Sequence, residues 1–220
     1  MKLLLTSAGI TNKSIAKALL DLAGLPAEKI RVAFIPTAAN VEEGDKSWII
    51  NDYVNLTKQT YGCVDIVDIS AIPQKVWLPR LTAANALILG GGNTFWLMHW
   101  IRKSGLDKIL PGLLEERIYV GISAGSMVAS KNIFLTSDKP VFDENRFGQT
   151  DIAGLGLINF YVRPHFNSQF FPKAKAEYIK QAAEQIPETI YAIDDQTAIK
   201  IDGDKNEIVS EGEYLIFNKK

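Results

Sequence analysis

Short apolar segments alternate with helical segments over the first 130 residues, and this alternation constrains the fold more than any other feature. Strand-like runs lie at 3–5, 31–35, 63–69, 86–89 and 118–122. Helical periodicity is found at 12–24, 43–61, 94–103 and 107–116, and a helix of small residues begins at Ala124. This order predicts an α/β fold with a doubly wound, mostly parallel sheet and helices on both faces.

The pattern changes after residue 130. Residues 132–160 are irregular, a strand at 160–163 leads into Pro164 and His165, and a helix is predicted over 170–185. Short strands follow at 189–193, 198–201, 207–210 and 214–217, with Asp202-Gly203-Asp204 as a turn between two of them. We expect an antiparallel C-terminal extension at the sheet edge and, without a linker, a single domain over 1–220.

Composition removes several functional classes. With 24 basic and 25 acidic side chains, the formal charge of −1 disfavours nucleic-acid or membrane partners. The single cysteine, Cys63, excludes an internal disulfide and a thiolate zinc site. The apolar run at the start is too short for a signal peptide or a membrane span, so a cytoplasmic location is the default expectation. Histidine chemistry must use His99 or His165.

Gly121-Ile122-Ser123-Ala124-Gly125 is a G-x-S-x-G motif between a predicted strand and a predicted helix. Glycines on both sides permit a tight turn that exposes Ser123 and directs the Ala124 N–H at a developing oxyanion. The plainer interpretation is a glycine-rich turn in which Ser123 caps a helix. The strand before the motif and the helix after it favour a nucleophile.

Gly90-Gly91-Gly92-Asn93-Thr94 follows another predicted strand. The segment lacks the Lys-Ser/Thr of a P-loop and the glycine spacing of a dinucleotide site, so it does not support nucleotide binding. An N–H of Gly91 or Gly92 could serve as a second oxyanion donor. The alternative is a tight turn with Asn93 as a helix cap.

A serine nucleophile needs a base. His99 is expected to be a packed or half-exposed helix residue, whereas His165 follows an apolar strand at the end where sites form. The third member should be a carboxylate that orients the imidazole. The candidates are Asp138, Asp143, Glu144, Asp151, Asp194 and Asp195; Asp194 and Asp195 directly follow a strand, and the residues alone leave the choice open.

Together, the segments at 90–95, 121–125 and 164–166 resemble the S51 serine peptidases, which include peptidase E, an α-aspartyl dipeptidase. Leu4-Leu5-Thr6-Ser7-Ala8-Gly9 and Phe34-Ile35-Pro36-Thr37-Ala38 are also similar to the family, so the resemblance covers almost the whole chain. It implies a flavodoxin-like fold similar to class I glutamine amidotransferases, with serine in place of their cysteine. Cys63 lies outside the elbow, so amidotransfer is not expected.

The resemblance implies Ser123 as nucleophile and His165 as base. Asp195 takes the position of the family's third member, with Asp194 as a rival. Asp138 matches an acidic position that shapes the site or contacts the substrate's amino group. The residues expected to bind the oxyanion or the substrate are Gly91, Gly92, Asn93 and Ala124. The basic residue that would hold an aspartyl side chain is left among Arg163, Lys139, Arg146 and Lys173.

We therefore expect a serine peptidase that cleaves short peptides, typically dipeptides with N-terminal aspartate, through a Ser-His-Asp triad and an acyl-enzyme. Neither a metal nor an organic cofactor is expected. Two alternatives stay open: another small-substrate acyl hydrolase, such as an esterase or amidase, and a non-catalytic binding module. The sequence leaves the oligomeric state open, a homodimer included.

Overall fold

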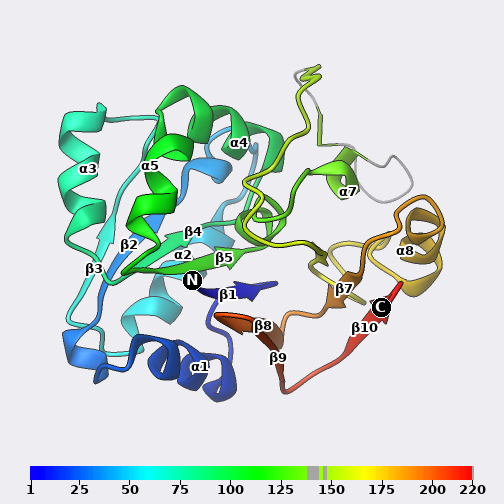
Figure 1. Cartoon of the computed structure of the whole chain (residues 1–220), viewed down its shortest axis with the longest axis horizontal. Helices are drawn as coiled ribbons and strands as arrows, with labels where there is room; N and C mark the ends of the chain where they lie inside the picture. Colours follow the sequence, from blue (N-terminus) through cyan, green and yellow to red (C-terminus); the bar gives the residue numbers. More distant parts are fainter. Residues whose placement is uncertain (138–143, 146–147, 220) are drawn as a thin grey trace.

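The core of the molecule is a seven-stranded sheet in the order β3-β2-β4-β5-β1-β8-β9 (Figure 1). The computed structural model describes residues 1–137, 144–145 and 148–219. The strands are β1 Lys2–Thr6, β2 Arg31–Ile35, β3 Cys63–Ile66, β4 Ala86–Leu89, β5 Ile118–Ile122, β8 Thr197–Asp202 and β9 Lys205–Ser210. Strands β1 to β5 pair in parallel, which confirms the predicted doubly wound sheet.

Helices cover both faces of this sheet (Figure 1). They are α1 Lys13–Ala23, α2 Ser47–Thr57, α3 Gln74–Thr82, α4 Thr94–Lys103, α5 Leu106–Leu113, α6 Ala124–Met127, α7 Phe134–Ser137 and α8 Ala176–Ala183, with 3-10 turns at Ala27–Lys29 and Thr37–Ala39. Strand alternation divides the core: Leu4 packs in the cluster of α1 and α2, while Leu3 and Leu5 pack in the cluster of α3, α4 and α5.

Local sequence signals set the helix boundaries. Asn12 caps α1 by accepting from the Ile15 N–H, and Gly24 ends that helix at φ 61°. Helix α2 is shorter than the predicted 43–61. Asp45 accepts hydrogen bonds from both the N–H and the hydroxyl of Ser47, which fixes the first turn of α2. The preceding residues therefore stay outside the helix.

The C-terminal part forms two features instead of one edge extension. Strands β8 and β9 extend the main sheet antiparallel to β1, and the turn at 202–204 joins them as predicted. The expectation that every late strand joins this edge is corrected. Strands β6 Tyr161–Arg163, β7 Ile190–Ile193 and β10 Tyr214–Phe217 form a separate three-stranded sheet. Strand β7 pairs in parallel with β6, and it therefore belongs to the three-stranded sheet instead of the edge of the seven-stranded sheet.

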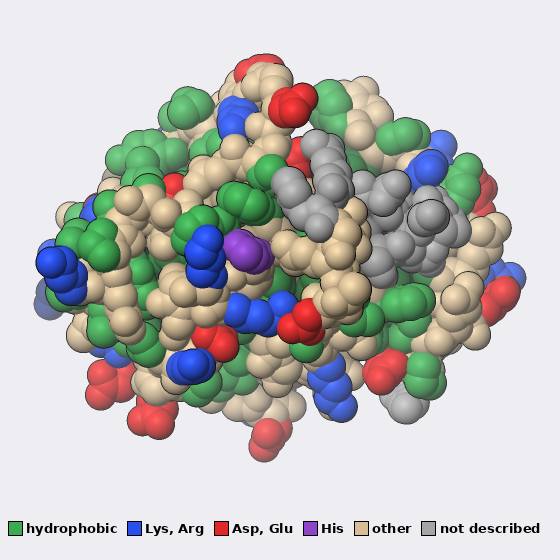
Figure 2. All heavy atoms as spheres, turned by 90° about the horizontal axis from the view of Figure 1, so that it is seen from above, with side chains coloured by type: hydrophobic (Ala, Val, Ile, Leu, Met, Phe, Trp, Pro, Cys, Tyr) green, Lys and Arg blue, Asp and Glu red, His purple; other side chains and the backbone are tan. Residues whose placement is uncertain are grey.

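The surface carries charges of both signs. Figure 2 shows Lys/Arg and Asp/Glu side chains interspersed with hydrophobic ones on the face seen from above. Among the described residues, no helix is both long enough and apolar enough to cross a bilayer. The carboxyl ends of β1, β2, β4 and β5 lie at one edge of the sheet, where parallel α/β proteins place their ligands.

Candidate active site

Ser123 lies on the strained turn between β5 and α6, at φ 49° and ψ −107°. A non-glycine residue in this region costs on the order of 1–3 kcal/mol, and such strain clusters at functional sites. The flanking glycines are required by close packing: a Cβ on Gly125 would lie 2.0 Å from Leu89 O, and one on Gly121 would lie 2.5 Å from Ser126 N. The backbone geometry is that of a nucleophile elbow.

The end of β1 holds this turn in place. Thr6 O accepts hydrogen bonds from Ser123 N at 3.0 Å and from Ser126 Oγ at 2.7 Å. Thr6 Oγ1 in turn donates to Gly121 O at 2.7 Å. These buried bonds join two neighbouring strands, so the position of the Ser123 hydroxyl is set by the sheet itself.

His165 reaches Ser123 from the second sheet. It follows β6 and Pro164, with φ 63°, and its Nε2 lies 2.8 Å from Ser123 Oγ. The imidazole stacks on Phe171, with ring centroids 4.1 Å apart and an interplanar angle of 5°. The His165 N–H donates to Ser7 Oγ at 2.8 Å. Both contacts restrict the orientation of the ring.

Asp195 contacts the opposite nitrogen of His165, at 2.8 Å from Nδ1 to Oδ1. Ser7 Oγ donates to the same carboxylate oxygen at 2.6 Å and lies 3.3 Å from Nδ1. Burial acts to raise the pKa of Asp195. The hydrogen bonds from His165 and Ser7 and the attraction of His165 outweigh this effect, so the pKa is lowered and the carboxylate is charged at neutral pH.

Asp194 is occupied elsewhere. Its Oδ1 accepts from Gln196 N at 3.0 Å and from Thr197 Oγ1 at 2.6 Å, and its Oδ2 accepts from Glu213 N at 2.6 Å. These hydrogen bonds stabilise the loop between β7 and β8 and connect it to Glu213, the residue before β10. Of the two adjacent carboxylates, Asp195 is therefore the one brought to His165.

Three backbone N–H groups belong to the segments that surround the Ser123 turn. Within the part of the chain that the structure describes, the N–H groups of Gly91, Gly92 and Ala124 make no hydrogen bond. A Cβ on Gly91 would lie 3.4 Å from Ser123 Cβ, so this glycine contacts the elbow. Asn93 has a different task, because its side chain caps α4 by accepting from Trp96 N.

The structure places several of the remaining candidates outside the site, and others lie outside the described residues. Arg163 is fully buried, its Nη1 donates to Leu135 O at 3.2 Å, and the structure does not bring it to the cavity described below. Asp151 pairs with Arg102 on the surface, and Lys173 is exposed and is not among the residues that line the cavity. The positions outside the described residues are Asp138, Lys139, Asp143 and Arg146. His99 is half-buried and stacks on Trp96, as predicted for a packed helix residue.

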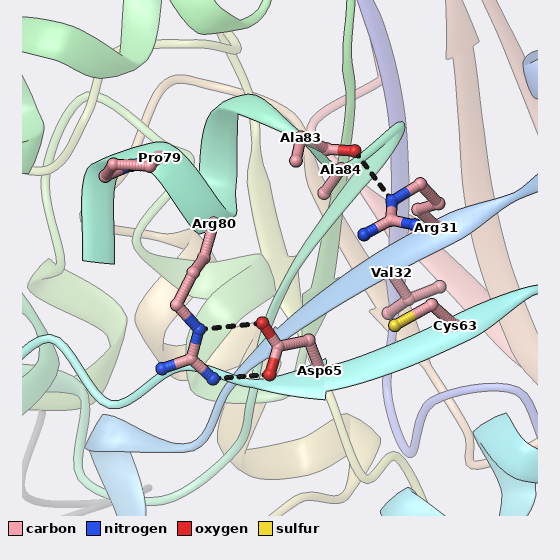
Figure 3. Close-up of a pocket in the computed structure, with 8 residues that line it drawn as sticks. All are labelled: Arg31, Val32, Cys63, Asp65, Pro79, Arg80, Ala83 and Ala84. Carbon is pink, nitrogen blue, oxygen red and sulfur yellow. Dashed lines mark hydrogen bonds and ion pairs between the residues drawn. The ribbon is translucent and has the colours of Figure 1, made fainter. Parts of the chain in front are cut away.

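A cavity of about 740 Å³ opens over Ser123, His165 and Asp195. One wall is the face of α2 that carries Trp48, Asn51 and Asp52 at positions i, i+3 and i+4. A smaller cavity of about 190 Å³ lies at the amino ends of β2 and β3, between Arg31, Cys63 and the Asp65–Arg80 ion pair (Figure 3). It is at the opposite end of the strands from Ser123.

Ser7 and Asp52 line the cavity over Ser123, although the sequence predicted no role for either of them. Ser7 belongs to the polar cluster that follows β1. Its position at a strand end indicated that the segment lies near the site, but it did not indicate which residues Ser7 contacts. Asp52 follows Trp48 by one helical turn, a spacing that places it on the same helix face. Burial and the charge of Asp195 raise the pKa of Asp52 to about 7, and the described residues offer it no hydrogen-bond or ion-pair partner.

Asp52→Asn is expected to stabilise the protein, and more at high pH. The folded-state pKa of about 7 exceeds the ordinary value of 3.8, so the folded state holds a proton that the unfolded chain has lost between these values. Stability therefore falls as pH rises toward 7. The gain in unfolding free energy should be about 2–3 kcal/mol larger at pH 8 than at pH 5.

Urea titrations at the two pH values measure this difference. Asp204→Asn, at an exposed turn position, is the matched control and should show no comparable pH dependence. Equal gains for Asp52→Asn at pH 5 and pH 8 would mean that the Asp52 carboxyl is not desolvated in the folded protein.

The fold and this geometry define an α/β protein with a serine, a histidine and a carboxylate connected by hydrogen bonds beneath a cavity. The model of peptidase family S51 matches residues 3–209. The chain belongs to this family and is a peptidase.

Several known proteins are similar to this chain over most of its length. An uncharacterized peptidase of Listeria monocytogenes is 30% identical over 179 residues, which cover 78% of this chain and 82% of the relative. A peptidase E of Shewanella amazonensis is 28% identical over 200 residues, or 83% of each chain. A solved structure from Listeria monocytogenes, provisionally assigned as a peptidase E, superimposes with a TM-score of 0.79 at 26% identity and covers 96% of this chain and 98% of its own.

Proposed function

We propose that the protein is a serine peptidase that cleaves short peptides through a Ser123–His165–Asp195 triad. The observation that carries this proposal is the continuous pair of 2.8 Å contacts from Ser123 Oγ through His165 to Asp195. The strained backbone of Ser123 and the open cavity above it support the same role.

In this mechanism His165 Nε2 takes the proton of Ser123 as Oγ attacks the peptide carbonyl. Asp195 holds the Nδ1–H and stabilises the imidazolium that forms. The N–H groups of Ala124 and of Gly91 or Gly92 stabilise the oxyanion. His165 then protonates the leaving amine, and water hydrolyses the acyl-enzyme. The route uses no metal and no organic cofactor.

The cavity volume matches a short peptide, since small-molecule sites typically span about 300–1,000 Å³. The family resemblance further implies dipeptides with N-terminal aspartate, which require a cation near the first side chain. The described lining contains no lysine or arginine. We therefore propose short peptides as the substrate class and leave the first residue to direct measurement.

A substrate panel tests the proposal. Purified enzyme should hydrolyse dipeptides or aminoacyl p-nitroanilides, with Asp-Xaa, other Xaa-Xaa and simple esters compared by kcat/KM. Turnover of esters without any peptide would identify a different acyl hydrolase. No turnover of any substrate would favour a binding module.

Ser7→Ala is expected to lower kcat by about 10-fold, because loss of a hydrogen bond to a charged group costs roughly 1.5–3 kcal/mol. Ser7 acts here as a positioning residue that holds Asp195 and the His165 backbone. KM should change less than kcat, since the role concerns orientation of the imidazole. Ser14→Ala, at a hydroxyl bound to Glu211 on the surface, is the matched control. An unchanged kcat in Ser7→Ala would show that Ser7 does not position Asp195 and His165 for catalysis.

A further inference from the structure

The described lining of the cavity over Ser123 is acidic. Its lining contains six carboxylates, Glu42, Glu43, Asp45, Asp52, Glu144 and Asp195, and the described part of the lining has no lysine or arginine. Clefts lined by one sign of charge focus the electric field and attract ligands of the opposite sign. Ser123 and His165 already define this cavity as the candidate site. The acidic lining therefore bears on the charge of the group that enters.

Several of these carboxylates have partners within the protein. Asp195 accepts from Ser7 and pairs with His165, while Asp45 accepts from Ser47. Glu144 accepts from the Thr94 N–H at 2.8 Å. Each of these hydrogen bonds compensates part of the cost of a carboxylate, so these three groups have less need of a ligand.

Asp52 is different. It is half-buried on α2 and lines the cavity, and no described residue gives it a hydrogen bond or an ion pair. The site surrounds it closely: a Cβ on Gly9 would lie 3.6 Å from Asp52 Oδ1, and one on Gly91 would lie between Ser123 Cβ, at 3.4 Å, and Trp48, at 3.8 Å. The α2 face with Trp48 and Asp52 thus packs against the segments that surround the nucleophile.

A partly desolvated carboxylate without a protein partner is costly, and a cation at hydrogen-bond distance offsets that cost. The raised pKa of Asp52 is the expected sign of such an uncompensated position. An aspartyl side chain in the same cavity would instead add a like charge close to Asp52 and Asp195.

Resting on the proposed peptidase function, we propose that Asp52 binds a cationic group on the first residue of the substrate, so that the enzyme prefers peptides with a cationic or neutral first side chain over peptides with N-terminal aspartate. The cation has two sources, the α-ammonium group or a lysine or arginine side chain. Both give the same ion pair with Asp52. The proposal concerns specificity and leaves the roles of Ser123 and His165 unchanged.

Steady-state kinetics at pH 8 test the proposal with Lys-Ala, norleucyl-Ala, Asp-Ala and their N-acetylated forms. The wild type should prefer Lys-Ala or norleucyl-Ala to Asp-Ala. Asp52→Asn should lower kcat/KM about 10- to 100-fold for peptides that carry the recognised cation, mainly through KM, as expected for loss of a charged hydrogen bond. Loss on every peptide with a free amine assigns the α-ammonium; loss on Lys-Ala alone assigns the side chain.

Binding gives a second readout that does not depend on turnover. Calorimetry of Lys-Ala with Ser123→Ala, with and without Asp52→Asn, should show the same 10- to 100-fold weakening. Asp204→Asn in the same background controls for net charge and should bind like its parent. Binding that depends on Asp52 without turnover by the wild type would overturn the proposed function but support this inference. A wild-type preference for Asp-Ala, or equal affinity with and without the Asp52 carboxylate, overturns the inference.

Discussion

Ser123→Ala is expected to lower kcat for peptide hydrolysis by about 10⁵- to 10⁶-fold, the scale of nucleophile removal in serine proteases. The substitution removes the Oγ that lies 2.8 Å from His165 Nε2 and leaves the elbow backbone in place. Substrate binding should persist, because Asp52 and Trp48 line the cavity independently of the hydroxyl. Single-turnover and steady-state assays on the best peptide of the panel measure the loss.

A control variant and a folding measurement separate loss of the nucleophile from loss of structure. Ser14→Ala, at a half-buried serine outside the cavity lining, should retain wild-type kcat. The circular dichroism spectrum and the urea midpoint of Ser123→Ala should match the wild type within the range of an ordinary surface substitution. A folded Ser123→Ala that keeps more than a tenth of the activity would show that another group attacks the substrate.

Asp195→Asn is expected to lower kcat by about 10⁴-fold, as in other triads where the amide stabilises the wrong imidazole tautomer. Asp195 Oδ1 lies 2.8 Å from His165 Nδ1 and accepts its hydrogen bond. An amide nitrogen at this position would donate to Nδ1 instead, which would move the ring proton to Nε2. The folded structure should survive, because Asn keeps the shape of the side chain.

Asp194→Asn is the matched neighbour and should behave in the opposite way. Its carboxylate accepts from Gln196, Thr197 and Glu213, so the substitution should cost about 1–3 kcal/mol of stability. Its kcat should fall by less than about 10-fold, since His165 keeps its partner. If Asp194→Asn instead lost more kcat than Asp195→Asn, the assignment of the two carboxylates would be reversed.

The parallel sheet could be predicted from the sequence because most of its strands are apolar runs bounded by turn signals, and β3 shows strand-like alternation of apolar and polar residues. Strand β4 illustrates this: Ala86 to Leu89 are buried on both faces, as a continuous apolar run indicates. The destination of β7 could not be predicted. Its pattern suits either sheet, and the decision depends on parallel pairing with β6, a contact between segments about 30 residues apart.

The elbow at Ser123 could also be predicted, because G-x-S-x-G between a strand and a helix specifies a local backbone geometry. The choice between Asp194 and Asp195 depends on where the two side chains point after β7, which periodicity does not encode. Ser7 and Asp52 were missed for a related reason. Their importance arises from distant segments, since Ser7 contacts residues 158 and 188 positions away.

The central claim is that Ser123 is the acylated nucleophile, and covalent labelling tests it most directly. A fluorophosphonate probe, followed by intact-mass measurement and peptide mapping, should add one adduct to the wild type, located on Ser123. Ser123→Ala should not be labelled, and Asp195→Asn should be labelled far more slowly. An adduct on Ser7 or another serine, or an unlabelled wild type that still hydrolyses peptides, would contradict the account.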